Sequence, residues 1–394
     1  MRSGCTPIPV GMIGGGPAGL LLSHVLSAHG IGNIVLERAS QAHVEARIRA
    51  GQIDHDAVEY LVEAGGGGRL LQEGIPQRGF TLRFGATTRR IDLEELTGGK
   101  HCTVYGQAEL TKDLIASRIA DGEPPLFEAE AVGIERNDDG PQVVVYRRNG
   151  SEHGTPCTYV VGCDGYFGIT RRVVAREAGL PIETRFPHAW VGIFTETPPI
   201  SDELSYVYHQ NGFALCSMRS PKLSRIYLQC NPEDTVEDRD DERFWRELFD
   251  RIGLDWGDRF RVGRTLERTV VQLRGYVSKT MRAGNVFLAG DAAHIVPPSA
   301  AKGLNLAIAD VKRLAAALIA RFSRGDASGL ADYSPDALRR AWAVQDFSWL
   351  MTDLLHSHPA RSSFHDRLKL TRLERLTGSR TGLRDFAHQY VGMP

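Results

Sequence analysis

Three glycines at fixed spacing place the strongest constraint on how this chain can fold. Gly14, Gly16 and Gly19 form G-x-G-x-x-G within residues 9–38, after a short apolar run and before an amphipathic one. This pattern predicts a strand, a tight turn, a helix and a second strand, in which the glycines allow the turn, the approach of a pyrophosphate and close helix packing. Free N–H groups at the helix start attract phosphate. Glu37 ends the second strand and can accept a hydrogen bond from a ribose hydroxyl, so the stretch predicts a site for FAD or NAD. A purely structural turn is the alternative.

Two later stretches suit a flavin better than a nicotinamide. Residues 160–172 contain an apolar run followed by Asp164 and a turn, and residues 287–294 contain a second run that delivers Asp291 to a turn. Asp291 can bond a ribitol hydroxyl. A helix that starts after Gly303 would aim its positive end at the ring, which stabilises the negative charge of reduced flavin. Each of these two stretches alone is typical of an ordinary strand end. Together with the glycine turn, and in this order, they favour FAD.

The order of patterns along the chain predicts a mixed protein, α/β in its nucleotide-binding part and α+β as a whole. Residues 1–179 are expected to form a Rossmann-like FAD-binding domain. Residues 180–290 show apolar–polar alternation at period two, which predicts an inserted antiparallel sheet. This segment is expected to be the substrate-binding domain, because it includes the polar residues of 205–230. A return strand is expected at 285–291. Residues 291–394 are expected to form a flavin-contacting turn and a helical C-terminal region.

Composition narrows the class of protein further. The chain has 394 residues, more than one average core holds, so two or three domains are expected. A net charge of −1 argues against a duplex nucleic-acid partner, which favours a basic face. No apolar run approaches the roughly 18 residues that cross a bilayer, and we expect no signal peptide. Six cysteines without a C-x-x-C pair favour reduced thiols, no metal site and a cytoplasmic location.

A group of polar residues in 205–230 is suited to a carboxylate. Ser217 and Arg219 are two apart, so on a strand they point to one face. That face would offer a hydroxyl and a guanidinium fork to a carboxylate. Tyr227 on a neighbouring strand would add a third donor. A solvated sheet edge is the alternative that the pattern alone leaves open.

Together these motifs resemble those of the class A flavoprotein aromatic hydroxylases. The resemblance rests on GGGPAG, CDG and GDAAHIVPP, and on RIRAG (47–51), VYGQ (104–107) and GFALCS (212–217). It runs from about residue 10 to the C-terminal YVGMP and is closest to the members that act on 4-hydroxybenzoate. It implies an FAD enzyme that uses NADPH or NADH and O2 to hydroxylate 4-hydroxybenzoate ortho to its hydroxyl, through a flavin hydroperoxide. The product would be 3,4-dihydroxybenzoate, and a homodimer through the helical tail is expected.

The resemblance also implies roles for individual residues. Tyr206, relayed to Tyr390, would activate the 4-hydroxyl, with the backbone carbonyl of Pro298 as a further catalytic contact. The residues expected to contact the substrate are Ser217, Arg219, Tyr227, Tyr206, Pro298 and Ser299. Those expected to bind FAD are Gly14, Gly16, Gly19, Glu37, Arg47, Arg49, Gln107, Asp164, Arg225, Asp291, Gly303, Leu304 and Asn305. Those expected to bind the nicotinamide are Arg38, Arg49 and Arg274.

Three departures from the family pattern leave details open. The ASQAH segment after Arg38 lacks the glutamine and tyrosine of strictly NADPH-dependent members. Phe167 replaces a histidine, which also leaves NADH and NADPH both possible as donors. Gln77 stands where a relay histidine is expected, and glutamine cannot titrate near neutral pH, so the proton would leave by another path.

Two alternatives to 4-hydroxybenzoate hydroxylation remain from the sequence. The first is the same chemistry on 4-aminobenzoate or another para-substituted benzoate, and Ser299 is the residue most suited to tune that choice. The second is an oxidase that reduces O2 to peroxide without hydroxylation. The presence of Tyr206, Arg219 and Tyr390 together argues against the second.

Overall fold

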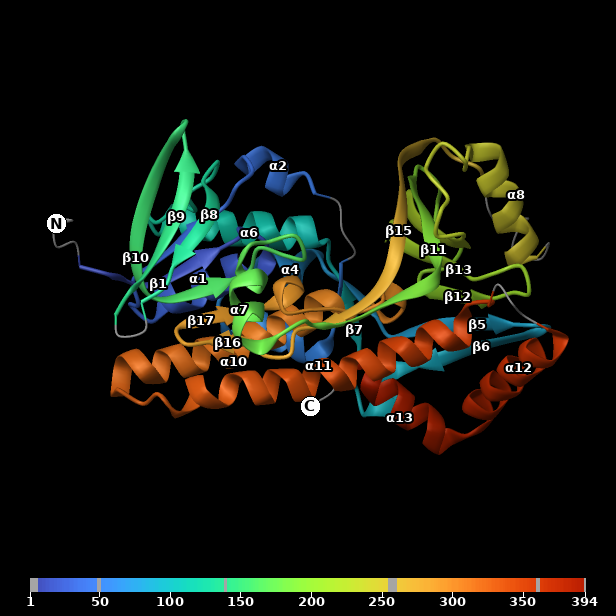
Figure 1. Cartoon of the computed structure of the whole chain (residues 1–394). Helices are drawn as coiled ribbons and strands as arrows, with labels where there is room; N and C mark the ends of the chain where they lie inside the picture. Colours follow the sequence, from blue (N-terminus) through green and yellow to red (C-terminus); the bar gives the residue numbers. More distant parts are fainter. Residues whose placement is uncertain (1–5, 48–50, 138–139, 254–260, 359–361, 393–394) are drawn as a thin grey trace.

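The computed structural model describes residues 6–47, 51–137, 140–253, 261–358 and 362–392, and it shows two lobes, each built around a sheet (Figure 1). Sheets of seven and eight strands form the lobes, and a third sheet has three strands. The mixed α/β class predicted from the sequence is confirmed.

The seven-stranded sheet has the order β16-β17-β10-β1-β2, with β9 and β8 added as an antiparallel ribbon on β10. Its strands β2, β1, β10 and β17 run parallel. Parallel strands are buried on both faces, and β1 and β17 accordingly consist almost wholly of apolar residues. The predicted return strand is confirmed as β17, which pairs with β10. The strands are β1 (Ile8–Ile13), β2 (Asn33–Leu36), β8 (Glu130–Glu135), β9 (Gln142–Arg148), β10 (Ser151–Gly162), β16 (Arg282–Ala283) and β17 (Val286–Leu288).

The eight-stranded sheet has the order β18-β15-β11-β14-β13-β12-β5-β6 and is mainly antiparallel. The antiparallel character predicted for its central strands is confirmed. Two of its strands, β5 and β6, come from the sequence range predicted for the FAD-binding domain. They belong to this sheet because β5 pairs in parallel with β12. The strands are β5 (Gly79–Phe84), β6 (Thr87–Asp92), β11 (Ile182–Thr195), β12 (Leu204–Tyr208), β13 (Ala214–Ser220), β14 (Leu223–Cys230), β15 (Thr265–Val277) and β18 (His294–Ile295). The domain limits at 179 and 290 stay a proposal.

A short sheet with the order β3-β7-β4 connects the two lobes along the chain. Both of its outer strands pair antiparallel with β7, and Gln52 of β3 and Gln77 of β4 lie opposite Val104 and Cys102 of β7. The strands are β3 (Gln52–Ile53), β4 (Ile75–Gln77) and β7 (Cys102–Val104).

One long helix, α11, belongs to both lobes and runs beneath them in Figure 1. Leu330 and Tyr333 near its start pack in the core of the first sheet, whereas Phe347 and Met351 near its end pack against the second. The predicted helical C-terminal region is therefore confirmed, and it closes the inner face of the second sheet. The helices are α1 (Pro17–Ala28), α2 (Gln41–Glu45), α3 (His55–Glu63), α4 (Gly68–Glu73), α5 (Leu93–Thr97), α6 (Gln107–Ala120), α7 (Thr170–Ala178), α8 (Asp241–Ile252), α10 (Gly303–Arg324), α11 (Ser328–Leu355), α12 (Ser363–Gly378), α13 (Arg380–Val391), and the 3-10 turns η1 (Gly290–Ala292) and η2 (Pro298–Ala300).

Helix α8 covers the other face of the second sheet, and its ends illustrate why the sequence folds as it does. Asp240 caps the start by accepting a hydrogen bond from Arg243 N. Two acidic residues in the first turn interact favourably with the positive end of the helix dipole. Phe244 and Leu248 point into a core that faces β11, β13 and β14. No helix in the described ranges is long and apolar enough to cross a membrane.

Candidate active site

Three loops meet at the carboxyl edge of the first sheet, because β1, β10 and β17 are parallel neighbours. Gly14 follows β1 with φ 109°, a region that L side chains rarely adopt, and a Cβ there would collide with the Cys163 carbonyl oxygen. Gly290 follows β17, and a Cβ there would lie 3.6 Å from the Cβ of Ala18 on α1. The three stretches that the sequence analysis assigned to one ligand therefore lie together.

The start of α1 is open to a ligand. Gly16 is its N-cap residue, no side chain caps the helix, and the first turn contains no acid. A Cβ on Gly16 would have no heavy atom within 4 Å, whereas a Cβ on Gly19 would collide with the Gly14 carbonyl oxygen. Gly19 thus serves close packing, and Gly16 leaves the backbone N–H groups accessible to a diphosphate.

Glu37 lies beside the glycine turn and is 5% exposed. Its carboxylate accepts hydrogen bonds from Gly15 N at 2.7 Å and from Ala39 N at 2.9 Å. Each carboxylate oxygen can accept a further hydrogen bond. The position therefore agrees with the predicted ribose contact, which stays a prediction.

The two aspartates predicted at this site differ in their surroundings. Asp164 accepts hydrogen bonds from the Thr170 N–H and hydroxyl, both at 2.9 Å, and so stabilises the start of α7. Burial raises the pKa of Asp164, and these hydrogen bonds oppose the shift. Its Oδ1 atom is buried and has no hydrogen-bond partner among the described residues. Asp291, in η1, is exposed.

The start of α10 resembles that of α1. No side chain caps it, its first turn holds no acid, and a Cβ on Gly303 would have no neighbour within 4 Å. Ala301, two residues earlier, has φ 54°, an uncommon conformation that often marks a functional segment. Two long, uncapped helix starts and the glycine turn fit the phosphates and the ring of FAD.

Asn305 and Leu304 lie in the first turn of α10. The Asn305 side chain accepts a hydrogen bond from Asp54 N at 2.9 Å and donates to Gln52 O at 3.1 Å. These bonds tie α10 to β3, so the amide of Asn305 is used within the protein. Its predicted contact with FAD stays a prediction.

The polar residues predicted for the substrate lie on one face of the second sheet. Pairing sets Tyr206 opposite Leu215, Leu215 opposite Tyr227, and Ser217 opposite Arg225 across β12, β13 and β14. Residues directly opposite one another point to the same face, so these side chains share the face that packs on α11 and α13. The solvated sheet edge considered for this segment does not apply to Tyr206 and Ser217, which are 1% and 5% exposed.

Arg219 is half-buried on the same hairpin, at a break in the register between Met218 and Ser220. Such a break can re-aim a side chain. No hydrogen bond or ion pair within the described ranges reaches its guanidinium. Burial lowers the pKa of Arg219, the nearby Tyr227 opposes this, and Arg225 adds to it. A half-buried cation without an anionic partner is partly desolvated without compensation, so this position is suited to bind an anion.

Arg225, in contrast, is already paired. It lies 3.2 Å from Glu267, donates to Thr269 Oγ1 at 3.0 Å and donates to Tyr227 OH at 3.2 Å. These contacts fix the side chain against β15. They also orient the Tyr227 hydroxyl, and the predicted link of Arg225 to FAD stays a prediction.

Tyr206 and Tyr390 meet inside the core, 184 residues apart in sequence, with their hydroxyl oxygens 3.0 Å apart. Burial raises the pKa of Tyr206, and the Tyr390 hydrogen bond opposes that shift. Burial and the neighbouring Tyr206 raise the pKa of Tyr390. Tyr390 OH also donates to Gln52 Oε1 at 3.4 Å, a contact that the sequence analysis did not identify. The predicted pair is thus in place as a chain of hydrogen bonds.

The turn before α10 holds Pro298 and Ser299. The Pro298 carbonyl accepts a hydrogen bond from Ala301 N at 3.0 Å and keeps a second lone pair. Ser299 is fully buried, and its hydroxyl lies 2.8 Å from Thr352 Oγ1 on α11. The Ser299 hydroxyl is thus bonded to α11, and its predicted role in the choice of substrate stays a prediction.

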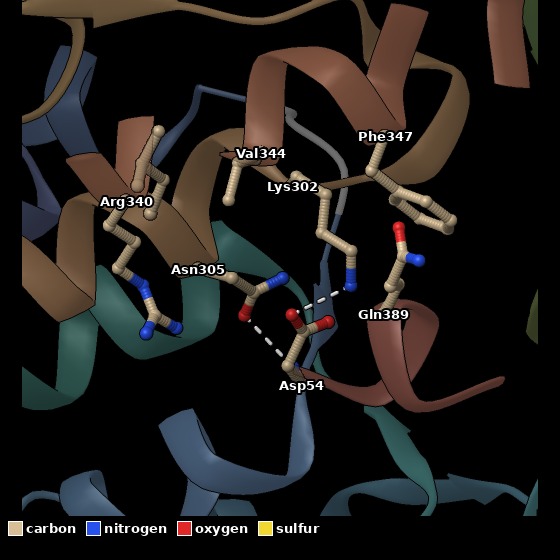
Figure 2. Close-up of a pocket in the computed structure, with 8 residues that line it drawn as sticks. Asp54, Lys302, Asn305, Arg340, Val344, Phe347 and Gln389 are labelled. Carbon is tan, nitrogen blue, oxygen red and sulfur yellow. Dashed lines mark hydrogen bonds and ion pairs between the residues drawn. The ribbon is translucent and has the colours of Figure 1, made fainter. Parts of the chain in front are cut away.

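A buried ion pair beside this turn was missed by the sequence analysis (Figure 2). Lys302 Nζ lies 2.8 Å from Asp54 Oδ2 and also donates to the Tyr390 carbonyl oxygen. Burial raises the pKa of Asp54, and Lys302 and Arg340 lower it. The local sequence contains no pattern that joins residues 54 and 302, because 248 residues separate them.

Two of the arginines predicted for the nicotinamide, Arg38 and Arg274, lie far apart in the sequence. Arg38 is exposed, and the guanidinium of Arg274 lies 4.6 Å from the centre of the Tyr166 ring. Arg47 is half-buried, and Arg49 lies outside the described residues. Gln107, predicted to contact FAD, begins α6. No hydrogen bond or ion pair among the described residues brings Arg38 and Arg274 together, so this site stays a prediction.

Comparisons with known proteins agree with this geometry. The sequence model of the FAD binding domain family matches residues 7–348. The chain is 40% identical over 385 residues to p-hydroxybenzoate hydroxylase from Acinetobacter baylyi, covering 98% of this chain and 95% of that protein. It is 24% identical over 379 residues to pentachlorophenol 4-monooxygenase from Sphingobium chlorophenolicum, covering 91% and 67% of the two chains.

The structure of p-nitrophenol 4-monooxygenase from Pseudomonas putida superposes with a TM-score of 0.82 at 17% identity, covering 98% of each chain. That of Pseudomonas aeruginosa PqsL with 2-aminobenzoylacetate superposes with a TM-score of 0.77 at 19% identity, covering 97% of this chain and 99% of that one. At these identities the two structures support the fold alone.

Proposed function

The chain belongs to the family of FAD-dependent aromatic monooxygenases, and from this premise we propose that it hydroxylates 4-hydroxybenzoate to 3,4-dihydroxybenzoate. The observation that carries the choice of an aromatic acid is Arg219, a half-buried cation with no anionic partner among the described residues. The 40% identity to p-hydroxybenzoate hydroxylase over nearly the whole chain supports the same choice.

FAD, when bound, supplies the redox chemistry: it takes electrons from NAD(P)H and, with O2, provides the oxygen that enters the ring. The chain's own residues hold and orient it. The glycine turn with the start of α1 would bind the diphosphate, and Glu37 would bind the adenosine ribose. Asp291 would bind the ribitol, and the start of α10 would lie at the ring, where a positive dipole favours the reduced state.

The carboxylate of the substrate would bind at Arg219, with Ser217 and Tyr227 as further donors. A carboxylate there would remove the cost of burying the guanidinium alone, which is a physical reason for affinity. Tyr227 is held ready by Arg225, which donates to its hydroxyl oxygen and leaves the phenol hydrogen free to point elsewhere.

The 4-hydroxyl would then face Tyr206. A hydroxyl that donates a hydrogen bond gains electron density on its oxygen, which makes the carbon ortho to it more nucleophilic, and that carbon is the one to be hydroxylated. The residues around Tyr206 are aromatic, with the ring of Phe80 centred 5.5 Å away and that of Phe213 6.3 Å away. Such walls exclude water, which protects the reactive oxygen from unproductive decay.

Product analysis of the purified FAD-loaded protein tests this proposal. The protein is incubated with NADH or NADPH and, in turn, 4-hydroxybenzoate, 4-aminobenzoate and benzoate. We expect 3,4-dihydroxybenzoate from the first in an amount close to that of the oxidised nicotinamide. Hydrogen peroxide that accounts for all the oxidised nicotinamide with every aromatic would contradict the proposal and favour an oxidase. Hydroxylation of 4-aminobenzoate alone would move the proposal to that substrate.

A further inference from the structure

The hydroxyl chain that begins at Tyr206 ends at an amide. Tyr390 OH lies between Tyr206 OH at 3.0 Å and Gln52 Oε1 at 3.4 Å. We propose that Gln52 is a positioning residue that sets the direction of this chain, so that Tyr206 presents an oxygen lone pair to a hydrogen-bond donor on the para position of the substrate. The inference rests on the proposed function only in placing the para substituent at Tyr206.

The direction follows from counting hydrogens. Each tyrosine hydroxyl has one hydrogen to donate, and an amide oxygen has none. With Gln52 Oε1 toward Tyr390, the Tyr390 hydroxyl donates to Gln52 and must accept from Tyr206. The Tyr206 hydrogen is then used, and the hydroxyl can only accept from a further group. Burial raises the pKa of both phenols, so both keep their hydrogens near neutral pH.

The described surroundings of Tyr390 offer its hydroxyl no acceptor other than Gln52 at this end of the hydrogen-bond chain. The Tyr390 ring stacks on Phe80 with centroids 4.5 Å apart and lies 6.3 Å from that of Phe386. The nearby Lys302 donates to Asp54 and to the backbone carbonyl of Tyr390, not to its hydroxyl. Gln52 is therefore the acceptor that the described residues provide for the Tyr390 hydroxyl, and the Gln52 side chain is only 6% exposed.

A second glutamine provides a matched comparison. Gln77 is 3% exposed and lies opposite Cys102 on β7, while Gln52 lies opposite Val104 two residues further along the same strand. Both glutamines therefore lie on one face of the small sheet. Gln77 Oε1 has no hydrogen-bond partner among the described residues, and the hydroxyl chain does not reach it. Two buried glutamines of one sheet face thus differ in whether they contact Tyr390.

The consequence is a requirement on the substrate. A para hydroxyl or amino group donates a hydrogen bond and satisfies Tyr206, whereas a para hydrogen does not. Without an acceptor at residue 52, the Tyr390 hydrogen would be buried without a partner, which costs more than an unused lone pair. The chain would then reverse, and Tyr206 would become a donor that suits phenolate and opposes an amino group.

Ligand binding to three FAD-loaded proteins tests the inference: the unaltered chain, Gln52→Met and Gln77→Met. Methionine resembles glutamine in size and has no strong acceptor. The dissociation constants of 4-aminobenzoate and benzoate are measured by calorimetry, and their ratio isolates the para contact because both ligands carry the same carboxylate. We expect Gln52→Met to reduce the preference for 4-aminobenzoate about tenfold, the size of one lost hydrogen bond in a buried site. Gln77→Met should leave the ratio within about twofold, well under one such hydrogen bond.

A spectroscopic readout accompanies the binding ratio. At one fixed pH, the phenolate fraction of bound 4-hydroxybenzoate, read from its ultraviolet absorbance, should rise in Gln52→Met and stay constant in Gln77→Met. Gln52→Leu repeats the test if Gln52→Met binds FAD poorly. An unchanged ratio and phenolate fraction in both Gln52 variants, or equal changes in Gln77→Met, would overturn the inference. Because these are binding measurements, they decide about Gln52 even if no hydroxylated product is formed.

Discussion

The ring of Tyr227 on β14 lies directly over Gly192 on the neighbouring strand β11, and a Cβ on Gly192 would come within 2.5 Å of that ring. No side chain other than hydrogen fits at Gly192 while Tyr227 keeps its place. The glycine therefore positions a predicted substrate donor without contacting the substrate. It also explains why a glycine, which weakens strands, stands inside a 14-residue strand.

Gly192→Ala should displace the Tyr227 ring and raise the KM for 4-hydroxybenzoate about tenfold, the effect of one hydrogen bond to a charged group. The FAD content of the purified protein should not change. Gly133→Ala is the matched control, because a Cβ at that strand position would lie 4.0 Å from Val145. An unchanged KM in Gly192→Ala would show that Tyr227 does not help to bind the substrate.

Arg219→Ala should raise the KM about 100-fold, since the loss of a charged partner in a buried site costs roughly 2–5 kcal/mol. Arg219→Lys should recover part of the loss, because lysine keeps the charge but not the planar fork. Lys222→Ala, which removes an exposed cation from the turn of the same hairpin, should have little effect on KM. Steady-state kinetics at saturating NAD(P)H measure all three, and equal effects at the two positions would remove Arg219 from the carboxylate site.

Tyr206→Phe should still bind the substrate through the carboxylate but should lose most of the coupling between NAD(P)H oxidation and hydroxylation. The reason is that no group then accepts a hydrogen bond from the para hydroxyl, so the ortho carbon loses electron density. We expect the yield of hydroxylated product per NAD(P)H to fall at least tenfold, within the range typical of a lost acid–base group, and peroxide to increase. Tyr208→Phe, on the same strand but bonded to Asp366, should stay coupled. Normal coupling in Tyr206→Phe would contradict the assigned role.

Gly14 and Gly16 should respond differently to alanine. Gly14→Ala should destabilise the protein even without FAD, because of its φ of 109° and the collision with Cys163 O. Gly16→Ala should leave the melting temperature of the FAD-free protein unchanged, since nothing lies near its Cβ position, but should weaken FAD binding about tenfold or more. Flavin fluorescence titration and thermal melting separate the two effects. Equal FAD affinity in Gly16→Ala and the unaltered chain would argue against a diphosphate at this turn.

Buried histidines should make stability depend on pH. Burial, together with the charges of Lys369 and His358, lowers the pKa of His188 to about 4. The unfolded chain binds a proton at His188 below its ordinary pKa of 6.5, whereas the folded chain does not until about 4. The folded state is therefore destabilised as the pH falls through this window, by roughly 3 kcal/mol at most from this residue.

His188→Phe, which preserves the ring contacts with Phe186 and His356, should reduce the loss of stability between pH 7 and pH 5. His356, whose pKa burial also lowers, remains and keeps part of the dependence. His388→Phe, at an exposed position on α13, should not alter it. Urea unfolding midpoints at the two pH values measure this loss of stability. An equal change of the midpoint between pH 7 and pH 5 in His188→Phe and in the unaltered chain would refute the role given to His188.

Much of the cofactor half of the molecule was predictable from local patterns. The turn at Gly14, the acid at Glu37 and the strand at 286–288 obey spacing rules that hold within a few tens of residues. Their meeting at one edge follows from parallel pairing, which the alternation of strand and helix indicates. The contacts of Ser299 were not predictable, because whether its hydroxyl turns toward the substrate or toward Thr352 depends on how α11 packs.

The sequence was therefore sufficient for the fold class and for the family, since these depend on periodicity and on motifs of short range. Only the tertiary structure decided which distant groups meet: Lys302 with Asp54, Tyr390 with Gln52, and Tyr227 with Gly192. These contacts join residues on different strands and helices, and their geometry is set by the packing of the C-terminal helices against both sheets. Packing of this kind depends on the summed contacts of the whole chain, so no local pattern encodes it.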